Sequence, residues 1–349
     1  MNTDVSLWLN ILDKTKNLFS SARPSQPVYL DKSKIIQELE LIERMLSSDI
    51  HFTIAFSGMT NVGKSTLMNA LLGDTVAPTK NTAWSSTAVE YQYSEQNYEI
   101  IVPLEGFRSL HKCFQTSEDL LSELNQFAVE GSSFQTEQPL VVRIPNDLLK
   151  GGLIIVDTPG FGASDGSDSN ALHDVILLSY LKKRQDNLRV FWIVKDNINK
   201  SALDFFKSHL NTFCTDLVVN LTDDDFCEKD RMEFEKTYKK SVGHTMRFHY
   251  INAKKAVKAE QKNDEIMLNS SGINRFKEYL TSFSSLEKRT YLIAENLKVL
   301  FLEMQDLFLI NRFECFWQPT AWGTVKALLS KTHDQDLLDA FLTLESKND

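Results

Sequence analysis

The chain has 349 residues, of which 42% are hydrophobic and 24% charged, and it contains only 13 glycines and 8 prolines. This composition excludes a disordered or fibrous protein and predicts a globular one, with two domains or one large domain carrying helical attachments. The net charge of −9 at pH 7 argues against a protein that mainly coats nucleic acid, because that task needs a basic surface.

The sequence nowhere holds 18 consecutive apolar residues, so no transmembrane helix is predicted. The apolar stretch near the N-terminus is too short and too acidic for a signal peptide. The four cysteines, Cys113, Cys214, Cys227 and Cys315, are far apart, which indicates a reducing compartment. We therefore expect a cytoplasmic protein, and peripheral contact with a membrane stays open.

Helical periodicity over residues 31–48 predicts an amphipathic helix ahead of a first buried strand, FTIAF, which is followed by a polar loop and a helix over 65–72. Further strand-like apolar runs cover residues 87–93, 98–104, 139–144, 152–157, 189–194, 216–221 and 247–252. Helical patterns separate the later runs, over residues 170–184, 200–211 and 227–240. Strands that alternate with helices are typical of a parallel sheet covered on both faces.

The predicted fold class is therefore α/β, with a doubly wound, mostly parallel sheet. The runs within 87–104 suggest an antiparallel hairpin at one edge of that sheet. After about residue 274 only helical patterns occur. We expect an N-terminal helical segment over 1–49, a sheet domain over 50–285, and a C-terminal helical segment over 286–349 that packs with the N-terminal helices in a bundle.

The segment GMTNVGKS at 58–65 fits the pattern GxxxxGK[ST] and lies between a buried strand and a helix. Main-chain N–H groups of such a loop can surround a polyphosphate at the helix N-terminus. Lys64 would reach the β and γ phosphates, and the Ser65 hydroxyl would bind Mg²⁺. The residues expected to bind phosphate are Gly58, Asn61, Val62, Gly63, Lys64, Ser65 and Thr66.

A second motif, DTPG, follows the apolar run that ends at Asp157. A carboxylate in this position can hold Mg²⁺ through water, and the Gly160 N–H can reach the γ-phosphate. DxxG alone is a weak signal, but downstream of a phosphate loop and behind a buried strand it is a strong one.

The sequence NLTD, from Asn220 to Asp223, follows a later strand and fits NxxD. The Asp223 carboxylate can accept both N–H donors of guanine, although it could instead cap the next helix. Asn252, Ala253 and Lys254 have the form of a loop whose main chain contacts guanine O6. The pattern favours guanine over adenine.

The order of GMTNVGKST, DTPG, NLTD and NAK resembles the Ras-like translation-factor class of GTPases, and NVGKSTLMNALLG is similar to the Era and Der ribosome-assembly GTPases. The long interval between Thr87 and Asp157, together with helices before and after the sheet domain, is more similar to the dynamin superfamily, especially bacterial dynamin-like proteins. This resemblance implies a dynamin-type G domain over 50–285.

The resemblance also implies an enzyme that hydrolyses GTP to GDP and phosphate with Mg²⁺, and whose nucleotide state moves the helical attachment. It makes Thr87 the switch threonine, with Thr82 as the rival. Lys64, Thr87 and Gly160 would be catalytic, and Ser65, Thr87 and Asp157 would hold the metal. Implied partners are guanine nucleotide and a second subunit, either a copy that pairs through its G domain or another dynamin-like chain.

Three residues depart from the family patterns. Thr60 replaces a glutamine that is usual in dynamins, Leu221 replaces the lysine of NKxD, and Phe161 stands where Ras-type enzymes place a water-orienting glutamine. Hydrolysis is therefore expected to be slow until a second subunit, a potassium ion or a partner completes the site. Two alternatives stay open, namely a nucleotide-gated binding module with negligible hydrolysis and an Era-like ribosome or RNA factor. The acidic charge counts against the last, and nucleic acid is not an expected partner.

Overall fold

The structure is a computed structural model that describes residues 9, 12–13, 32–46, 51–73, 76–78, 88–104, 109–130, 138–160, 169–197, 199–210, 213–222, 226–242 and 246–284. The chain divides into two compact units, one of Met1–Asp49, Gly243–Thr245 and Ser285–Asp349, the other of Ile50–Val242 and Met246–Ser284. The first unit contains α2 (Lys32–Met45), within the helix predicted over 31–48. Its Leu39, Ile42 and Met45 side chains are buried at helical spacing. The predicted C-terminal segment over 286–349 lies outside the described residues.

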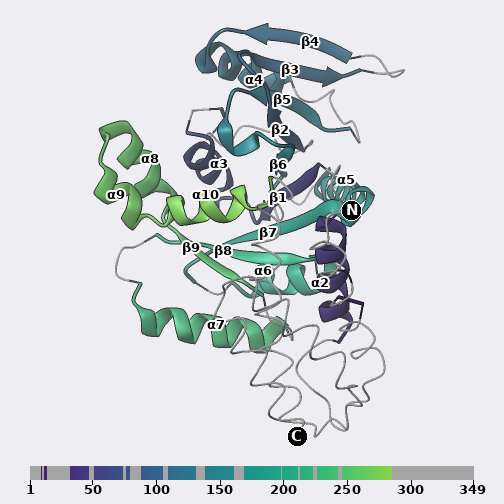
Figure 1. The fold of residues 1–349 in the computed structure, drawn as a ribbon, viewed down its shortest axis with the longest axis vertical. Helices are drawn as coiled ribbons and strands as arrows, with labels where there is room; N and C mark the ends of the chain where they lie inside the picture. Colours follow the sequence, from purple (N-terminus) through teal and green to yellow (C-terminus); the bar gives the residue numbers. More distant parts are fainter. Residues whose placement is uncertain are drawn as a thin grey trace, which may run out of the picture. The chain divides into compact units, whose positions relative to one another are not determined.

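The second unit is built on a nine-stranded sheet in the order β4-β3-β5-β2-β6-β1-β7-β8-β9 (Figure 1). Its strands are β1 (Phe52–Gly58), β2 (Val89–Tyr93), β3 (Tyr98–Pro103), β4 (Ser109–Phe114), β5 (Leu140–Ile144), β6 (Leu153–Asp157), β7 (Leu188–Lys195), β8 (Thr215–Asn220) and β9 (Phe248–Ile251). The pairs β6–β1, β1–β7, β7–β8, β8–β9 and β2–β5 are parallel. The pairs β2–β6, β3–β5 and β3–β4 are antiparallel. The predicted α/β fold with a mostly parallel sheet is confirmed.

Helices connect these strands. They are α3 (Lys64–Leu72), α4 (Ser117–Glu130), α5 (Ser169–Lys183), α6 (Lys200–Phe205), α7 (Glu228–Val242), α8 (Ala253–Lys262), α9 (Glu265–Ser270) and α10 (Ile273–Thr281), with 3₁₀ turns η3 (Asp147–Leu149) and η4 (Gln185–Asn187) and the π-helical turn η5 (Phe206–Leu210). None of the helices in the described ranges is both long and apolar enough to cross a membrane.

Alternation along the central strands divides the core between the two faces of the sheet. On one face, Trp192 and Leu217 pack in one cluster with buried residues of α5, α6, η5 and α7, such as Leu181 and Phe234. On the other face, the rings of Phe56 and Phe191 contact Phe276 of α10. The sheet is therefore covered on both sides, as its nearly continuous apolar strands require.

A buried polar cluster lies on the α10 face. Asp216 of β8 forms an ion pair with Arg189 of β7, at 2.5 Å between Oδ1 and the guanidinium. Its other oxygen, Oδ2, lies 3.0 Å from His249 Nε2 and accepts a hydrogen bond of 2.8 Å from the Tyr279 hydroxyl. Burial raises the pKa of Asp216, but Arg189 and His249 outweigh that effect and hold the pKa below its usual range. This carboxylate ties three elements of the sheet unit together.

The predicted edge hairpin within residues 87–104 is wrong. β5 lies between β2 and β3, pairing parallel with β2 and antiparallel with β3. The partner of β3 is β4, which the sequence analysis did not predict because this edge strand is largely exposed and lacks an apolar run. Short-range patterns in the sequence identify β2 and β3 as strands. They do not reveal that β5, which comes later in the sequence, lies between them.

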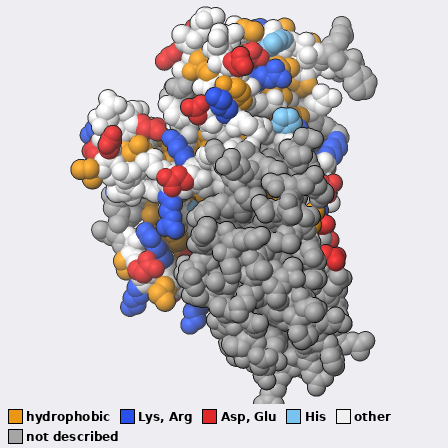
Figure 2. Space-filling model, in the orientation of Figure 1, with side chains coloured by type: hydrophobic (Ala, Val, Ile, Leu, Met, Phe, Trp, Pro, Cys, Tyr) orange, Lys and Arg blue, Asp and Glu red, His pale blue; other side chains and the backbone are white. Residues whose placement is uncertain are grey.

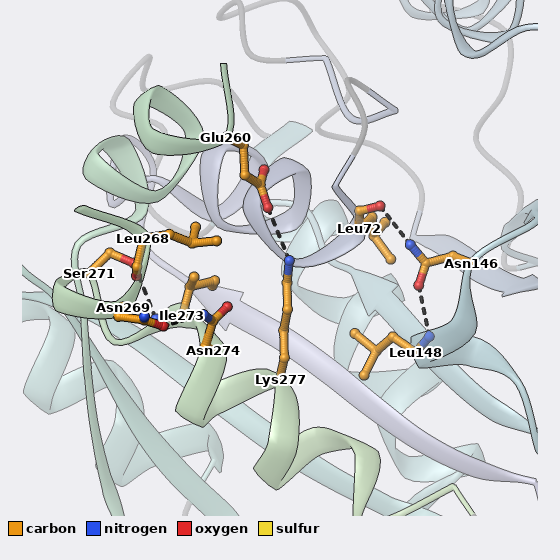
Figure 3. Close-up of polar contacts among 10 residues, drawn as sticks. All are labelled: Leu72, Asn146, Leu148, Glu260, Leu268, Asn269, Ser271, Ile273, Asn274 and Lys277. Atoms are coloured by element: carbon orange, nitrogen blue, oxygen red, sulfur yellow. Dashed lines mark hydrogen bonds and ion pairs between the residues drawn. The ribbon is translucent and has the colours of Figure 1, made fainter. Parts of the chain in front are cut away.

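Side-chain contacts fix the helices around α3 (Figure 3). The Asn146 side chain donates to the Leu72 carbonyl at 2.6 Å, at the last residue of α3, and accepts from the Leu148 N–H at 2.9 Å. Lys277 of α10 reaches Glu260 of α8 at 3.1 Å. These contacts hold α3 and α8 in place, and both helices begin at the carboxyl edge of the sheet.

Candidate functional site

The phosphate-loop motif connects β1 to α3. The loop turns sharply because Asn61 and Gly63 both adopt the left-handed backbone region, at φ values of 62° and 91°. A methyl group on Gly63 would lie 2.4 Å from Asn220 Nδ2, and one on Gly58 would lie 2.6 Å from the Ile193 carbonyl oxygen. Both glycines are therefore required by close packing.

Lys64, the first residue of α3, folds back over this loop. Its Nζ donates to the carbonyl oxygens of Gly58 and Met59, at 3.2 and 3.1 Å. Burial lowers the pKa of Lys64, and the charge of Asp157 opposes that shift. Ser65 and Thr66 follow in the first helical turn, where main-chain N–H groups have no partner within the helix. The loop thus combines a cation with main-chain donors at a helix N-terminus, which suits an anionic ligand.

Asp157 ends β6 and lies opposite Phe56 of β1 in the parallel register. Its Oδ1 is buried and finds no hydrogen-bond partner among the described residues. Burial raises the pKa of Asp157 to about 6, although the Lys64 ammonium acts in the opposite direction. A buried carboxylate oxygen that lacks a donor fits a hard divalent cation or its bound water, so the residues suit Mg²⁺.

The DTPG segment packs directly on the loop. The Thr158 N–H and hydroxyl both donate to the Phe56 carbonyl oxygen, at 3.2 and 2.8 Å. A methyl group on Gly160 would lie 2.9 Å from Thr60 Cγ2 and 3.0 Å from Lys64 Nζ. The Gly160 main chain therefore lies beside the Lys64 ammonium, as a γ-phosphate contact at both residues requires.

Asn220, at the end of β8, joins the phosphate loop to the predicted base loop. Its Nδ2 donates to the Val62 carbonyl oxygen at 2.8 Å, and its Oδ1 accepts from the Ala253 N–H at 3.2 Å. The next loop is shaped by Asn252, whose side chain caps α8 by accepting from the Lys255 N–H at 2.9 Å. Lys254 lies exposed in the first turn of that helix. The structure thus brings the phosphate loop, Asn220 and the loop from Asn252 to Lys254 together at one edge of the sheet.

Several predicted positions lie outside the described residues. They are the switch threonine Thr87, its rival Thr82, the base-reading Asp223, and Phe161 after DTPG. Their roles stay predictions.

Two supports of the site were missed by sequence analysis. Asp196, just after β7, accepts from the N–H and hydroxyl of Thr222 at 2.8 and 2.6 Å, and so anchors the NLTD loop next to Asp223. Buried Asn69 of α3 accepts from the N–H groups of Val76 and Ala77, at 3.1 and 2.7 Å. Neither residue carries a motif, because each one acts on a main-chain segment brought near it by the fold.

A third support joins β2 to α5. The buried Glu90 carboxylate accepts from the Tyr180 hydroxyl at 2.8 Å and forms an ion pair with Arg184. The Arg184 guanidinium also lies over the Tyr180 ring, 5.2 Å from its centre. Glu90, Tyr180 and Arg184 form what we call the β2–α5 brace. It fixes the strand that follows residues 79–87 to the helix that follows residues 161–168.

Two curated proteins are similar to this chain at low identity. A dynamin-like protein 2 from Campylobacter jejuni (strain 81-176) is 23% identical over 299 residues, which cover 80% of this chain and 44% of the relative. An uncharacterised protein from Caldicellulosiruptor sp. (strain Rt8B.4) is 23% identical over 287 residues, with 74% of this chain and 64% of the relative covered. The chain thus spans less than two thirds of the length of either relative.

Two solved structures, both described as parts of an oligomerised bacterial dynamin pair for sensing and tethering membranes, match at 16% identity with a TM-score of 0.47. The matches cover 98% and 100% of this chain and 51% and 66% of the solved chains. Residues 54–246, more than half of the chain, match the sequence profile of the dynamin family. They contain the phosphate loop, the DTPG segment and Asn220, so this chain belongs to the dynamin family.

Proposed function

We propose that this chain binds GTP with Mg²⁺ and hydrolyses it to GDP and phosphate. The observation that carries the proposal is the buried Oδ1 of Asp157, which lacks a partner among the described residues and feels the charge of Lys64, beside a loop of main-chain donors. A folded protein seldom leaves such a carboxylate incomplete unless a ligand completes it.

The proposed roles combine the sequence motifs with the geometry of the described residues. The N–H groups of the loop over 58–66 bind phosphate oxygens, and Lys64 neutralises the β and γ phosphates as water attacks the γ-phosphorus in line with the leaving oxygen. The Gly160 N–H holds the γ-phosphate. Ser65, Asp157 and the predicted Thr87 would hold Mg²⁺, which supplies charge neutralisation at the β and γ oxygens. Asp223 reads guanine, with support from Asn252, Ala253 and Lys254, and Asp196 holds Thr222, the residue before it in the sequence.

A second subunit is part of the proposal, either a copy of this chain that pairs through its G domain or another dynamin-like chain. Phe161 offers no group that could orient water, so turnover is slow for the isolated chain and rises with protein concentration. Nucleotide-driven changes in the segments around Thr87 and Gly160 move the helical attachment. Among the described residues, Cys113 and Cys227 form no disulfide, which supports a cytoplasmic location, where contact with a membrane would be peripheral.

Thermal unfolding with nucleotide tests the proposal. GTP with Mg²⁺ should raise the melting temperature far more than ATP does, because a ligand at about 100 times its Kd adds about 2.7 kcal/mol of stability. Lys64→Ala should remove this protection, while the matched control Lys262→Ala, at the exposed end of α8, should keep it. Equal protection by ATP would overturn the guanine assignment, and protection by neither nucleotide would overturn the proposal. A rate of phosphate release per chain that stays constant as the protein concentration rises would argue against the second subunit.

A further inference from the structure

The edge hairpin of β3 and β4 carries three potential metal ligands on one face, far along the sheet from the nucleotide site. Glu99 of β3 lies directly opposite Cys113 of β4 in the antiparallel register, and His111 precedes Cys113 by two residues. Directly opposed residues, and residues two apart on a strand, share one face. The register alone therefore places a carboxylate, an imidazole and a thiol together.

The side chains are already close to one another. His111 Nε2 lies 3.1 Å from Glu99 Oε2 and 3.9 Å from Cys113 Sγ, and the ligand atoms of all three residues lie within 4.8 Å of one another. Zinc bonds of about 2.0 to 2.3 Å in a tetrahedron place ligand atoms about 3.3 to 3.6 Å apart. An ion could therefore be bound after small rotations of the side chains.

The surroundings leave the three groups available. His111 and Cys113 are exposed, whereas Lys112 between them reaches toward α4 and forms an ion pair with Glu123. Figure 2 shows acidic, basic and histidine side chains exposed together at the surface in the region of β3 and β4. The Arg143 guanidinium lies 3.6 Å from Glu99 Oε2, so it competes for that oxygen, but a carboxylate has a second one.

We propose that Glu99, His111 and Cys113 form a binding site for a divalent metal of zinc-like softness, with water as the fourth ligand. Thiolate and imidazole together select such ions over Mg²⁺ and Ca²⁺, which prefer oxygen ligands. The bound ion joins the edge strand β4 to β3, and it stabilises the hairpin in proportion to the logarithm of the free metal concentration. The proposal does not depend on the nucleotide site.

Cobalt titration of the full, nucleotide-free chain tests this site. Excess Mg²⁺ blocks oxygen-only sites, and a phosphine reductant keeps the thiols reduced without binding the metal. We expect a thiolate-to-cobalt charge-transfer band in the near ultraviolet that saturates at one ion per chain and disappears on addition of Zn²⁺. Cys113→Ser should remove the band, whereas Cys227→Ser, at another exposed cysteine, should keep it.

His111→Ala and Glu99→Gln should each weaken cobalt binding by about tenfold or more, since even the loss of an outer-shell partner costs about that much. Absence of the band, its persistence in Cys113→Ser, or its loss in Cys227→Ser would overturn the proposal. Unchanged affinity in both His111→Ala and Glu99→Gln would also overturn it, because the thiol would then bind cobalt alone.

Discussion

Two aspartates of the same sheet, buried Asp216 and half-buried Asp157, have opposite surroundings. Asp216 is surrounded by Arg189, His249 and Tyr279, and its pKa is held low. Asp157 has an oxygen without a hydrogen-bond partner in the described ranges, and its pKa is raised to about 6. Burial acts on both carboxylates, so the partners make the difference.

The contrast separates a structural carboxylate from one that is proposed to bind a ligand. A buried charge whose partners are all protein groups stabilises the fold only as part of its cluster, and removing one member leaves the others uncompensated. A buried charge with an unused oxygen destabilises the protein until something binds it. The three predictions that follow test this distinction, in order of decreasing effect.

Asp216→Asn should cause the largest loss of stability. Without the carboxylate charge, the buried Arg189 guanidinium loses its ion pair with Asp216, so the free energy of unfolding should fall by about 3–5 kcal/mol. Urea unfolding measures this loss. The matched control is Glu260→Gln, which breaks the partly exposed ion pair with Lys277 and should cost less than about 1 kcal/mol. Similar losses in the two variants would contradict a structural role for Asp216.

Asp157→Asn should leave the nucleotide-free protein as stable as the wild type or more stable, because it removes a buried charge that lacks a complete set of partners. The protection that Mg²⁺ adds to GTP should fall sharply. Thermal unfolding with GTP, with and without Mg²⁺, measures both effects. A loss of nucleotide-free stability as large as that of Asp216→Asn would place Asp157 among the structural carboxylates.

The pH dependence of stability and of Mg²⁺-dependent GTP affinity that arises from Asp157 should be the smallest of the three effects. The pKa of Asp157 is about 6 when folded and near 3.8 when unfolded, so the folded chain binds this proton more tightly. Asp157 therefore destabilises the nucleotide-free chain most above pH 6, and stability is regained as the pH falls from 6 toward 3.8. Mg²⁺ needs the ionised carboxylate, so the Mg²⁺-dependent part of GTP affinity should weaken about tenfold at pH 5.

Measurements of GTP affinity at several pH values check this prediction. Asp157→Asn is the reference, because residue 157 cannot titrate in that variant and the remaining pH dependence includes that of the nucleotide itself. Parallel pH profiles in the wild type and in the variant would show that Asp157 does not titrate in this range.

The central sheet could be predicted from the sequence because its strands are buried on both faces and read as nearly continuous apolar runs. The phosphate loop could be predicted because Gly58, Gly63 and Lys64 occur at the fixed spacing that a loop needs to surround phosphate groups. Both signals are local. The roles proposed for Asp223 and Thr87 stay predictions.

The rest depends on contacts between distant parts of the chain. β4 was missed because an exposed edge strand needs no apolar run, and the β2–β3 hairpin was wrong because β5 separates these strands. Asp196 acts on a loop 26 residues away, and Glu90 acts on a helix residue 90 residues away. An isolated acidic residue gives no sign in the sequence of which distant backbone or helix it will hold.

The β2–α5 brace makes one strand and one helix depend on a single side chain. Glu90 lies on β2, Tyr180 lies on α5, and Arg184 directly follows that helix. A movement of α5 is therefore passed to β2 through the shared carboxylate. A single neutral replacement at Glu90 would uncouple the strand from the helix while every nucleotide-facing residue stayed unaltered.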